Sequence, residues 1–190
     1  MFAYSMAEQT EMWPLEPTHT DELFTLTEQN RPFLRNWFAW VEAVHTPYDT
    51  RVYIDDMAKR RKLGEGYGFG LFLDGKLCGV AELKGIDSPD RSCRLGFWLC
   101  EADQGKGRMT QACGALTDYA IDTCGLNRVE IRVSAENLRA RAVPERLGYT
   151  LEGVARQAKY RNGRFVDMAV YSILAEDWAE MDRMSRNIGY

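Results

Sequence analysis

The sequence lacks several features that define common classes of protein. In its 190 residues no uninterrupted apolar run approaches the roughly 18 residues of a membrane-spanning helix, so we expect no membrane partner. The opening MFAYSMAEQTEM has no Lys or Arg and no continuous apolar run, so we expect no secretory signal in it. Internal repeats and Pro/Gly/Ser-rich linkers are also missing. This favours a single domain over 1–190, with a core from about residue 8 to 178.

Histidine is scarce and cysteine is scattered. The five cysteines form no CxxC motif, and each lies in an apolar segment, a pattern typical of reduced, buried thiols in a cytoplasmic protein. A catalytic cysteine needs a nearby histidine, and the chain has only His19 and His45. We therefore expect a cytoplasmic protein with neither a cysteine nucleophile nor a metal site.

Charge is distributed unevenly along the chain. Eight acidic and two basic residues give the stretch 1–50 a charge of −6, within a total of −4. Eleven basic and six acidic residues give 104–164 a charge of +5. A nucleic-acid partner is not expected, because its binding face would carry a basic stripe throughout. The pattern instead allows a small anionic ligand at one site and a cationic partner at another.

Hydrophobic periodicity predicts an α/β fold with a sheet of mixed direction. Asp74-Gly75 and Asn162-Gly163 mark two hairpin turns. The expected strands are 8–15, 67–73, 76–86, 91–99, 129–134, 149–160 and 164–174. The expected helices are one through Leu23–Thr27 that Pro32 ends, an aromatic-rich one at 33–44, and others at 49–63, 106–124 and 138–148.

A glycine-containing turn between a strand and a helix is the most informative segment. The strand Leu95–Leu99 leads to Gln104-Gly105-Lys106-Gly107-Arg108-Met109-Thr110, where a helix begins. Glycines allow successive N–H groups to face one point, and the helix N-terminus adds further donors and its positive dipole end. With the charges of Lys106 and Arg108, the segment predicts a cradle for a pyrophosphate.

Two other phosphate-binding loops are excluded. The segment has no GxxxxGK[ST], so it is not a nucleotide triphosphatase loop. It has no GxGxxG either, and the expected acidic residue about 20 positions later is missing. A GxG turn alone is weak support, and it gains weight only from the segments that follow.

Those segments resemble the GNAT acetyltransferases. QGKGRMTQA is similar to their pyrophosphate-binding motif, and NLRARAVPERLGYTLEG to the second half of their cofactor site. NRPFLRNWFAW and NGRFVDMAVYSILAEDW resemble the Rim-type subgroup, which acetylates N-termini of ribosomal proteins and related small amines. The resemblance spans about residues 11 to 178. One departure is Met109, where the family usually has Gly or Ala.

The resemblance implies a single-domain GNAT-like fold, with a mixed, mostly antiparallel central sheet flanked by helices, and acetyl-CoA as cofactor. Backbone donors of the turn would hold the pyrophosphate, the strand would pair with the pantetheine arm, and Asn137 would bind a pantetheine amide or simply cap a helix. Arg139 or Arg141 would reach a phosphate of the nucleotide. The implied cofactor residues are Phe97, Trp98, Leu99, Gln104, Gly105, Lys106, Gly107, Arg108, Met109, Thr110, Asn137 and Arg141.

The implied reaction is direct transfer of the acetyl group to a primary amine within a ternary complex. The expected acceptor is a protein or peptide N-terminus, and a small amine such as an antibiotic or polyamine is the alternative. A non-catalytic acyl-CoA-binding module is a further alternative. A homodimer is compatible with the resemblance.

Catalytic side chains are harder to assign. Family positions for a tyrosine, a serine and a carboxylate align with Pro144, Ala140 and Lys159, none of which supplies that chemistry. The remaining candidates are Glu82, Asp167 and Tyr160. Each has a non-catalytic alternative. Glu82 could be a solvated residue of a strand, Asp167 could form a structural hydrogen bond or salt bridge, and Tyr160 could be a core or rim aromatic.

The acceptor groove is expected around two tryptophans. Trp37 and Trp40 have the spacing of one helix face, where the subgroup lines its groove, although core packing is the alternative for one of them. The acidic stretch 1–50 would form the groove wall and favour acceptors with a positive charge near the amine.

Overall fold

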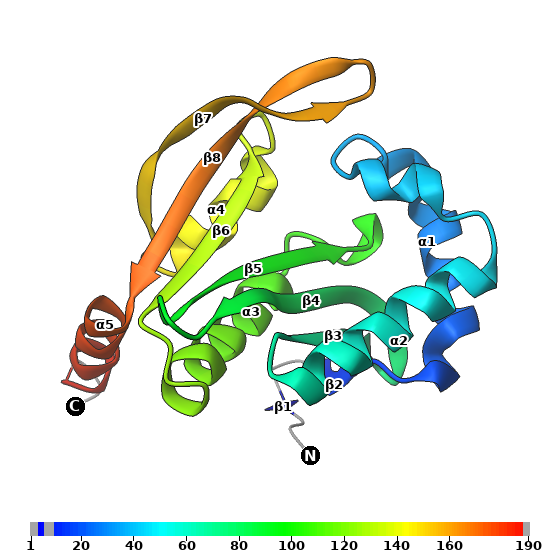
Figure 1. Cartoon of the computed structure of the whole chain (residues 1–190). Coiled ribbons are helices and arrows are strands. Elements are labelled where there is room, and N and C mark those ends of the chain that lie inside the picture. Colours follow the sequence, from blue (N-terminus) through cyan, green and yellow to red (C-terminus); the bar gives the residue numbers. More distant parts are fainter. Residues whose placement is uncertain (1–3, 6–9, 188–190) are drawn as a thin grey trace.

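Three neighbouring strands form the centre of the sheet, as their sequence patterns predict. The computed structural model describes residues 4–5 and 10–187 (Figure 1). The three strands are β3 (Gly66–Leu73), β4 (Lys76–Asp87) and β5 (Ser92–Leu99). Asp74 and Gly75 join β3 to β4 with φ angles of 51° and 74°, the left-handed pair that a type I′ turn requires.

All described strands belong to one sheet in the order β1-β2-β3-β4-β5-β6-β8-β7. Among them only β5 and β6 run parallel, which confirms the predicted mixed, mostly antiparallel arrangement. The remaining strands are β1 (Tyr4–Ser5), β2 (Thr10–Pro14), β6 (Arg128–Ser134), β7 (Thr150–Arg161) and β8 (Arg164–Leu174).

Helices cover both faces of the sheet. α1 (Thr20–Leu34) and α2 (Pro47–Leu63) pack on one face, and α3 (Arg108–Asp118) and α4 (Leu138–Arg146) on the other. The two-residue period of β4 divides its side chains between these layers. Val80 joins the cluster under α1 and α2, whereas Ala81 and Leu83 join the cluster under α3.

The parallel pairing of β5 with β6 is short. It matches Ser92–Leu95 with Arg128–Ile131 and then stops, although both strands continue. Figure 1 shows the two strands diverging beyond this point, so that β5 stays with β4 while β6 stays with β8. The carboxyl end of β5 therefore has a strand neighbour on one side only.

The segment around Pro32 folds differently from the prediction. α1 continues through Pro32 to Leu34, and the expected helix at 33–44 is instead a loop with a 3-10 helix, η2 (Ala39–Ala43). Pro32 lies in the last turn of α1, so its missing N–H removes one bond from a helix that is already ending. Arg31 donates hydrogen bonds to the carbonyls of Val41 and Val44, which fastens the loop to α1.

Two other helix ends also depart from the expected bounds. α2 begins at Pro47 because Thr46 and Asp49 form a capping box around its first turn. α5 (Ala175–Asn187) was not predicted, and it follows β8 without a loop. Trp178 donates its indole N–H to Asp118 at 2.7 Å and so anchors α5 to the end of α3.

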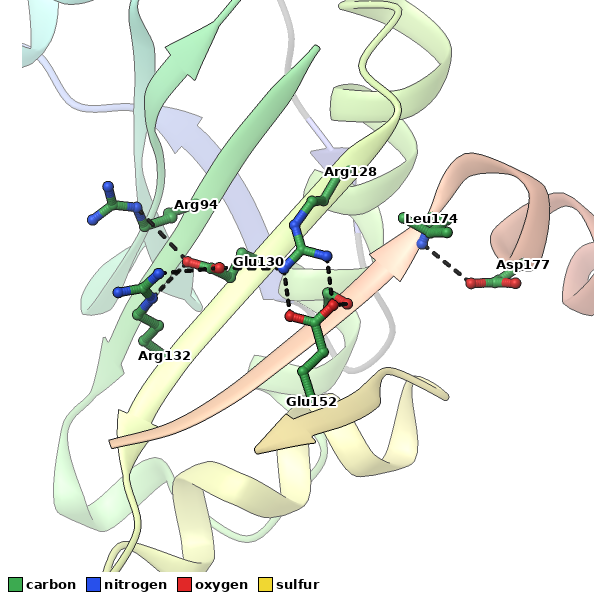
Figure 2. Close-up of polar contacts among 8 residues, drawn as sticks. Arg94, Arg128, Glu130, Arg132, Glu152, Leu174 and Asp177 are labelled. Atoms are coloured by element: carbon green, nitrogen blue, oxygen red, sulfur yellow. Dashed lines mark hydrogen bonds and ion pairs between the residues drawn. The ribbon is translucent and has the colours of Figure 1, made fainter. Parts of the chain in front are cut away.

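An ion network covers the face of β5, β6 and β8 opposite α3. Figure 2 shows Arg94, Arg128 and Arg132 around Glu130, with nitrogen–oxygen distances of 3.8, 3.3 and 2.7 Å. Arg128 also pairs with Glu152 at 2.6 Å, and this hydrogen bond lowers the Glu152 pKa to about 2. Arg128 and Arg132, two of the eleven basic residues of the stretch 104–164, are therefore neutralised locally.

The five cysteines are free, and all but the half-buried Cys124 are buried. Burial raises the pKa of the Cys93 thiol to about 12 and also raises that of Cys113, which keeps both thiols protonated. In the part of the chain that the structure describes, no helix is long and apolar enough to cross a membrane.

Candidate functional site

The divergence of β5 from β6 leaves one edge of β5 facing a gap. The Cys100 N–H donates to the Cys78 carbonyl on β4 at 2.8 Å. Because backbone groups alternate in direction along a strand, the N–H and C=O of Leu99 point the other way, toward the gap. The Leu99 carbonyl accepts a hydrogen bond from the side-chain amide of Gln104 at 3.0 Å. The edge from Phe97 to Leu99 is thus open to pairing with an extended polar ligand.

The side chains of this edge point away from the gap. Phe97 and Leu99 pack in the core cluster that includes α3, whereas Trp98 lies in the cluster of α1 and α2 and is only 8% exposed. The predicted cofactor contacts of Phe97 and Leu99 can therefore be made by their backbone, and Trp98 belongs to the opposite face of the sheet.

Two left-handed glycines lead into α3. Gly105 has a φ of 81°, and Gly107, the N-cap of α3, has a φ of 78°. The first N–H groups of a helix have no intrahelical acceptor, and Gly107 has no side chain to cap them. A Cβ added at either glycine would meet no atom within 4 Å, so there is room above the turn. Met109 is buried in the core and Thr110 is half-buried. The turn has the geometry of an anion-binding site.

The two basic side chains of the turn lie in different places. Lys106 is exposed and free to approach an anion held by the turn. Arg108 is 7% exposed, and its guanidinium donates to the Thr10 hydroxyl at 3.3 Å and to the Asp103 carbonyl at 3.5 Å. The expectation that Arg108 adds its charge to the cradle is therefore wrong for its side chain, although its backbone N–H lies in the first turn of α3.

The start of α4 lies beside the same turn. Asn137 is the N-cap, and its side-chain oxygen accepts the Ala140 N–H at 3.1 Å, as the simpler interpretation predicts. Arg139 donates to the side-chain oxygen of Gln104 at 3.4 Å. Gln104 thus connects β5, the glycine turn and α4.

Arg141 does not lie at this turn. Its guanidinium donates to the Tyr171 hydroxyl at 2.8 Å and to Glu145 at 3.5 Å, on the side of β8. Of the two arginines expected near a phosphate, the structure places Arg139 at the turn and corrects the choice of Arg141. Arg139 and Arg141 are two residues apart on α4, so they point in different directions. The sequence alone does not show which of them faces the turn, because that depends on how the helix packs.

Glu82 lies on the other face of the sheet, the face that α1 and α2 cover. Glu82 on β4 lies opposite Gly96 on β5. Trp98, two residues further along β5, is on the same face of the sheet. The Glu82 side chain is 17% exposed and lies 2.8 Å from Lys84 Nζ, so it is not the solvated carboxylate of the alternative interpretation. Burial raises the pKa of the nearby Tyr53 hydroxyl well above its usual value, and the Glu82 charge adds to this shift. Tyr53 was not among the sequence candidates.

Trp37 and Trp40 do not share a helix face, because the segment that carries them is the loop after α1. Trp40 is 40% exposed, and its ring lies 6.3 Å from that of Trp98. The guanidinium of Arg161 lies over the Trp37 ring, 5.4 Å from its centroid. Trp40 therefore lies beside Trp98 on the Glu82 face, and Trp37 contacts the hairpin of β7 and β8.

The β7–β8 hairpin meets the loop after α1. Arg161 donates to the Trp37 carbonyl at 3.0 Å, and the Asn162 side chain donates to the Arg35 carbonyl at 3.1 Å. In Figure 1 the hairpin tip and this loop face each other beyond the ends of β5 and β6. These contacts fasten the tip of the hairpin to the loop after α1.

The two remaining catalytic candidates lie on this hairpin in structural roles. Asp167 accepts the Gln157 N–H at 2.8 Å, where β7 has two extra residues, and Gln157 has a φ of 51°. Tyr160 is 61% exposed and packs edge-on against Phe165. Both arrangements match the simpler interpretations that the sequence left open, a structural hydrogen bond and a rim aromatic.

Several acidic residues of the first fifty positions are engaged with nearby groups. Glu28 pairs with Arg31, Glu42 pairs with Arg35, and Asp49 caps α2, where hydrogen bonds from the His45 and Thr46 N–H groups lower its pKa. Glu22 accepts the Leu77 N–H at 2.7 Å. Only Glu28 and Glu42 among these pair with basic residues, and the charge of −6 already counts both arginines. The preference for cationic acceptors therefore stays a prediction. Glu8 lies outside the described residues.

The described residues contain no group of three or more His, Cys, Asp or Glu side chains arranged for a metal ion. The site thus consists of a strand edge that ends at a turn with anion-binding geometry, and of a face with aromatic and carboxylate side chains on the other side of the same strand.

Comparison with known proteins agrees with this geometry. Residues 11–150 match the model of the acetyltransferase (GNAT) domain. The chain belongs to the GNAT acetyltransferase family. It is therefore an acetyl-CoA-dependent N-acetyltransferase by family.

This acetyltransferase is similar over nearly its whole length to several known proteins. It is 35% identical to the putative ribosomal N-acetyltransferase YdaF of Bacillus subtilis, over 94% of this chain and 98% of the relative. Its fold matches RimL, the ribosomal L7/L12 α-N-protein acetyltransferase solved with coenzyme A, with a TM-score of 0.89 over 93% of this chain and 99% of that one, at 24% identity. It also matches the microcin C7 self-immunity acetyltransferase MccE, solved with acetyl-CoA and AMP, with a TM-score of 0.84 and 26% identity over 88% and 93% of the chains.

The positions at which this acetyltransferase departs from its family remain without catalytic groups. Ala140 is half-buried on α4, Pro144 is buried on the same helix, and Lys159 is exposed on β7. Neither Ala140 nor Pro144 carries a side-chain group that could donate a proton to the leaving thiolate.

We predict that the glycine turn is required for binding CoA. Wild-type protein should melt at a higher temperature with CoA, because a ligand at about 100 times its Kd stabilises the native state by roughly 2.7 kcal/mol. Gly107→Glu should remove this increase, because it places a side chain and a negative charge in the turn. Differential scanning fluorimetry with and without CoA measures both.

Gly64→Glu is the matched control. Gly64 has a φ of 72°, and a Cβ there also meets no atom within 4 Å, but it ends α2 far from the turn. Both substitutions carry the same left-handed strain and the same charge. If Gly107→Glu kept the CoA-dependent increase, or if Gly64→Glu lost it as well, the turn would not be the binding site.

Proposed function

We propose that this protein transfers the acetyl group of acetyl-CoA to the free α-amine of a protein or peptide N-terminus. The observation that carries the proposal is the β5 edge. On one side it ends at an anion-binding turn, and on the other its Trp98 lies beside Glu82 and Trp40. A relative of high coverage named as a putative ribosomal N-acetyltransferase supports the choice of acceptor.

The cofactor would be held mainly by backbone groups. N–H groups from Gln104 to Thr110 bind the pyrophosphate, and the exposed Lys106 and the turn-facing Arg139 supply positive charge. The edge from Phe97 to Leu99 pairs with the amides of the pantetheine arm, as one strand pairs with another. Asn137 keeps its capping bond and offers its side-chain N–H to the same arm.

Acetyl-CoA, when bound, supplies the acetyl group as a thioester. The N–H of Leu99 points into the gap, where it stabilises negative charge on the carbonyl oxygen as the amine attacks. The amine attacks in its neutral form, after the ammonium has lost one proton to solvent, and Glu82 takes the second proton as the C–N bond forms, directly or through one water. A new C–N bond replaces the C–S bond, and the thiolate leaves. It is a tolerable leaving group without a side-chain donor, which is consistent with Ala140 and Pro144.

An α-amine suits this site better than a lysine. Its pKa of about 7.7–8.0 leaves a useful neutral fraction near pH 7, whereas a lysine near 10.4 is almost fully protonated. A small amine is the second candidate, and similarity to the spermidine N(1)-acetyltransferase of Escherichia coli, 27% identical over 84% of this chain and 82% of the relative, favours it. The third alternative was a module that binds acyl-CoA without catalysing a reaction. Membership of an enzyme family does not support it. A homodimer remains a proposal that sedimentation would test.

We predict that a peptide with a free N-terminus is acetylated faster than the same peptide with a blocked N-terminus and a free internal lysine. The rate should rise from about pH 6.5 to 8.5 as the α-ammonium loses its proton. Mass spectrometry of the products and thiol release measure site and rate. Preference for the internal lysine, or acetylation of small amines alone, would contradict the proposed acceptor.

We also predict that Glu82→Gln lowers kcat by roughly 10²-fold, because it removes the proton acceptor. The increase in melting temperature with CoA should be unchanged. Asp167→Asn is the matched comparison, since an asparagine oxygen can still accept the Gln157 N–H, and its rate should stay within about threefold of wild type. If the two effects were reversed, Asp167 rather than Glu82 would be the base.

A further inference from the structure

Arg161 is a buried cation whose partners are all neutral. It ends β7 and is 8% exposed. One terminal nitrogen donates to the Trp37 carbonyl at 3.0 Å, the other to the Ser134 hydroxyl at 3.4 Å, and the guanidinium lies over the Trp37 ring. Among the described residues, no carboxylate forms an ion pair with it.

Two other arginines of β6 and the hairpin, Arg128 and Arg164, have acidic partners. Arg164, three residues later on the same hairpin, pairs with Glu136 at 2.7 Å, and Arg128 pairs with Glu130 and Glu152. Burial lowers the pKa of Arg161, the nearby Arg164 lowers it further, and Glu136 acts in the opposite direction without contacting it. A buried guanidinium without a counter-ion is costly, and buried charges in proteins are normally paired.

The location of Arg161 shows which ligand could supply that counter-ion. Ser134 is the last residue of β6, on the strand that diverges from β5, and Trp37 belongs to the loop after α1. The guanidinium therefore links the end of β6, where it has diverged from β5, to the loop after α1. By strand alternation Ser134 shares the face of Glu130 and Arg132, opposite α3, which is the face on which Glu82 and Trp98 lie. Arg161 is on the acceptor side, away from the glycine turn.

We propose that Arg161 binds a carboxylate of the acceptor, supplied by an Asp or Glu within its first few residues. The inference rests on the proposed function, and it replaces the preference for cationic acceptors with one for acidic acceptors. A planar guanidinium fits a carboxylate through paired N–H donors, and the contact would hold the N-terminus at a fixed distance from the amine. Arg161 then acts as a specificity residue rather than a catalytic one.

The test uses three peptides that differ only at the second residue, Asp, Asn or Lys. For wild type, kcat/KM should be at least about tenfold higher for Asp than for Asn, equivalent to ~1.4 kcal/mol, and lowest for Lys. In Arg161→Gln the Asp/Asn ratio should fall to about one, through a higher KM for the Asp peptide with kcat little changed. Arg161→Lys should retain part of the preference, because it keeps the charge.

Arg164→Gln is the matched control, since it removes the same charge from the same hairpin where the partner is Glu136. It should keep the wild-type ratio. A wild-type ratio near one overturns the inference, and so does an equal loss for both peptides in Arg161→Gln, which would show a structural link only. If Arg161→Gln does not fold, the wild-type ratio and Arg161→Lys still decide. If no peptide is acetylated at its N-terminus, the proposed function itself fails.

Discussion

The site depends on one constraint, the early end of the parallel pairing between β5 and β6. Four residues of β5 pair with β6, and the rest of the strand has β4 as its only neighbour. Backbone N–H and C=O groups inside a protein need partners, so an incomplete sheet edge is favourable only if something else completes it. The Gln104 side chain satisfies the Leu99 carbonyl, and a ligand laid along the edge would satisfy more. The glycine turn lies where such a ligand would end. The early end of the β5–β6 pairing therefore places both the strand edge and the turn for recognition of the cofactor.

The same strand separates two environments with different charge. On the α3 side, Lys106 and Arg139 stand beside helix N-termini, which suits phosphate groups. On the α1–α2 side, Glu82 is held by Lys84 and Arg161 has no acidic partner among the described residues. Net charge along the sequence does not show this, because side chains such as Glu28, Glu42 and Asp49 are engaged within seven residues of themselves. The electrostatic field at the substrate site depends on how individual charges are paired, rather than on the net charge of a sequence segment.

Much of the fold follows from local patterns in the sequence. The hairpin at Asp74-Gly75, the strand that leads to Gly105 and Gly107, and the N-cap at Asn137 follow from residue preferences that act over a few positions. Pro32 does not end α1 where propensity suggests, because the loop after it is fastened by tertiary hydrogen bonds from Arg31. The directions of Arg108, Arg141 and Arg161 were likewise not predictable, since each is set by partners far along the chain. A long side chain has no preferred partner until the elements are packed.

Hydrogen exchange of individual amides, measured by NMR with and without CoA, tests the central claim most directly. The N–H groups of Phe97 and Leu99 point into the gap, whereas that of Trp98 points toward β4. CoA should therefore slow exchange at Phe97 and Leu99 together with the amides from Gly105 to Thr110, and leave the already slow Trp98 unchanged. If CoA slowed only the amides of the turn, or none of these, the β5 edge would not be where the cofactor binds.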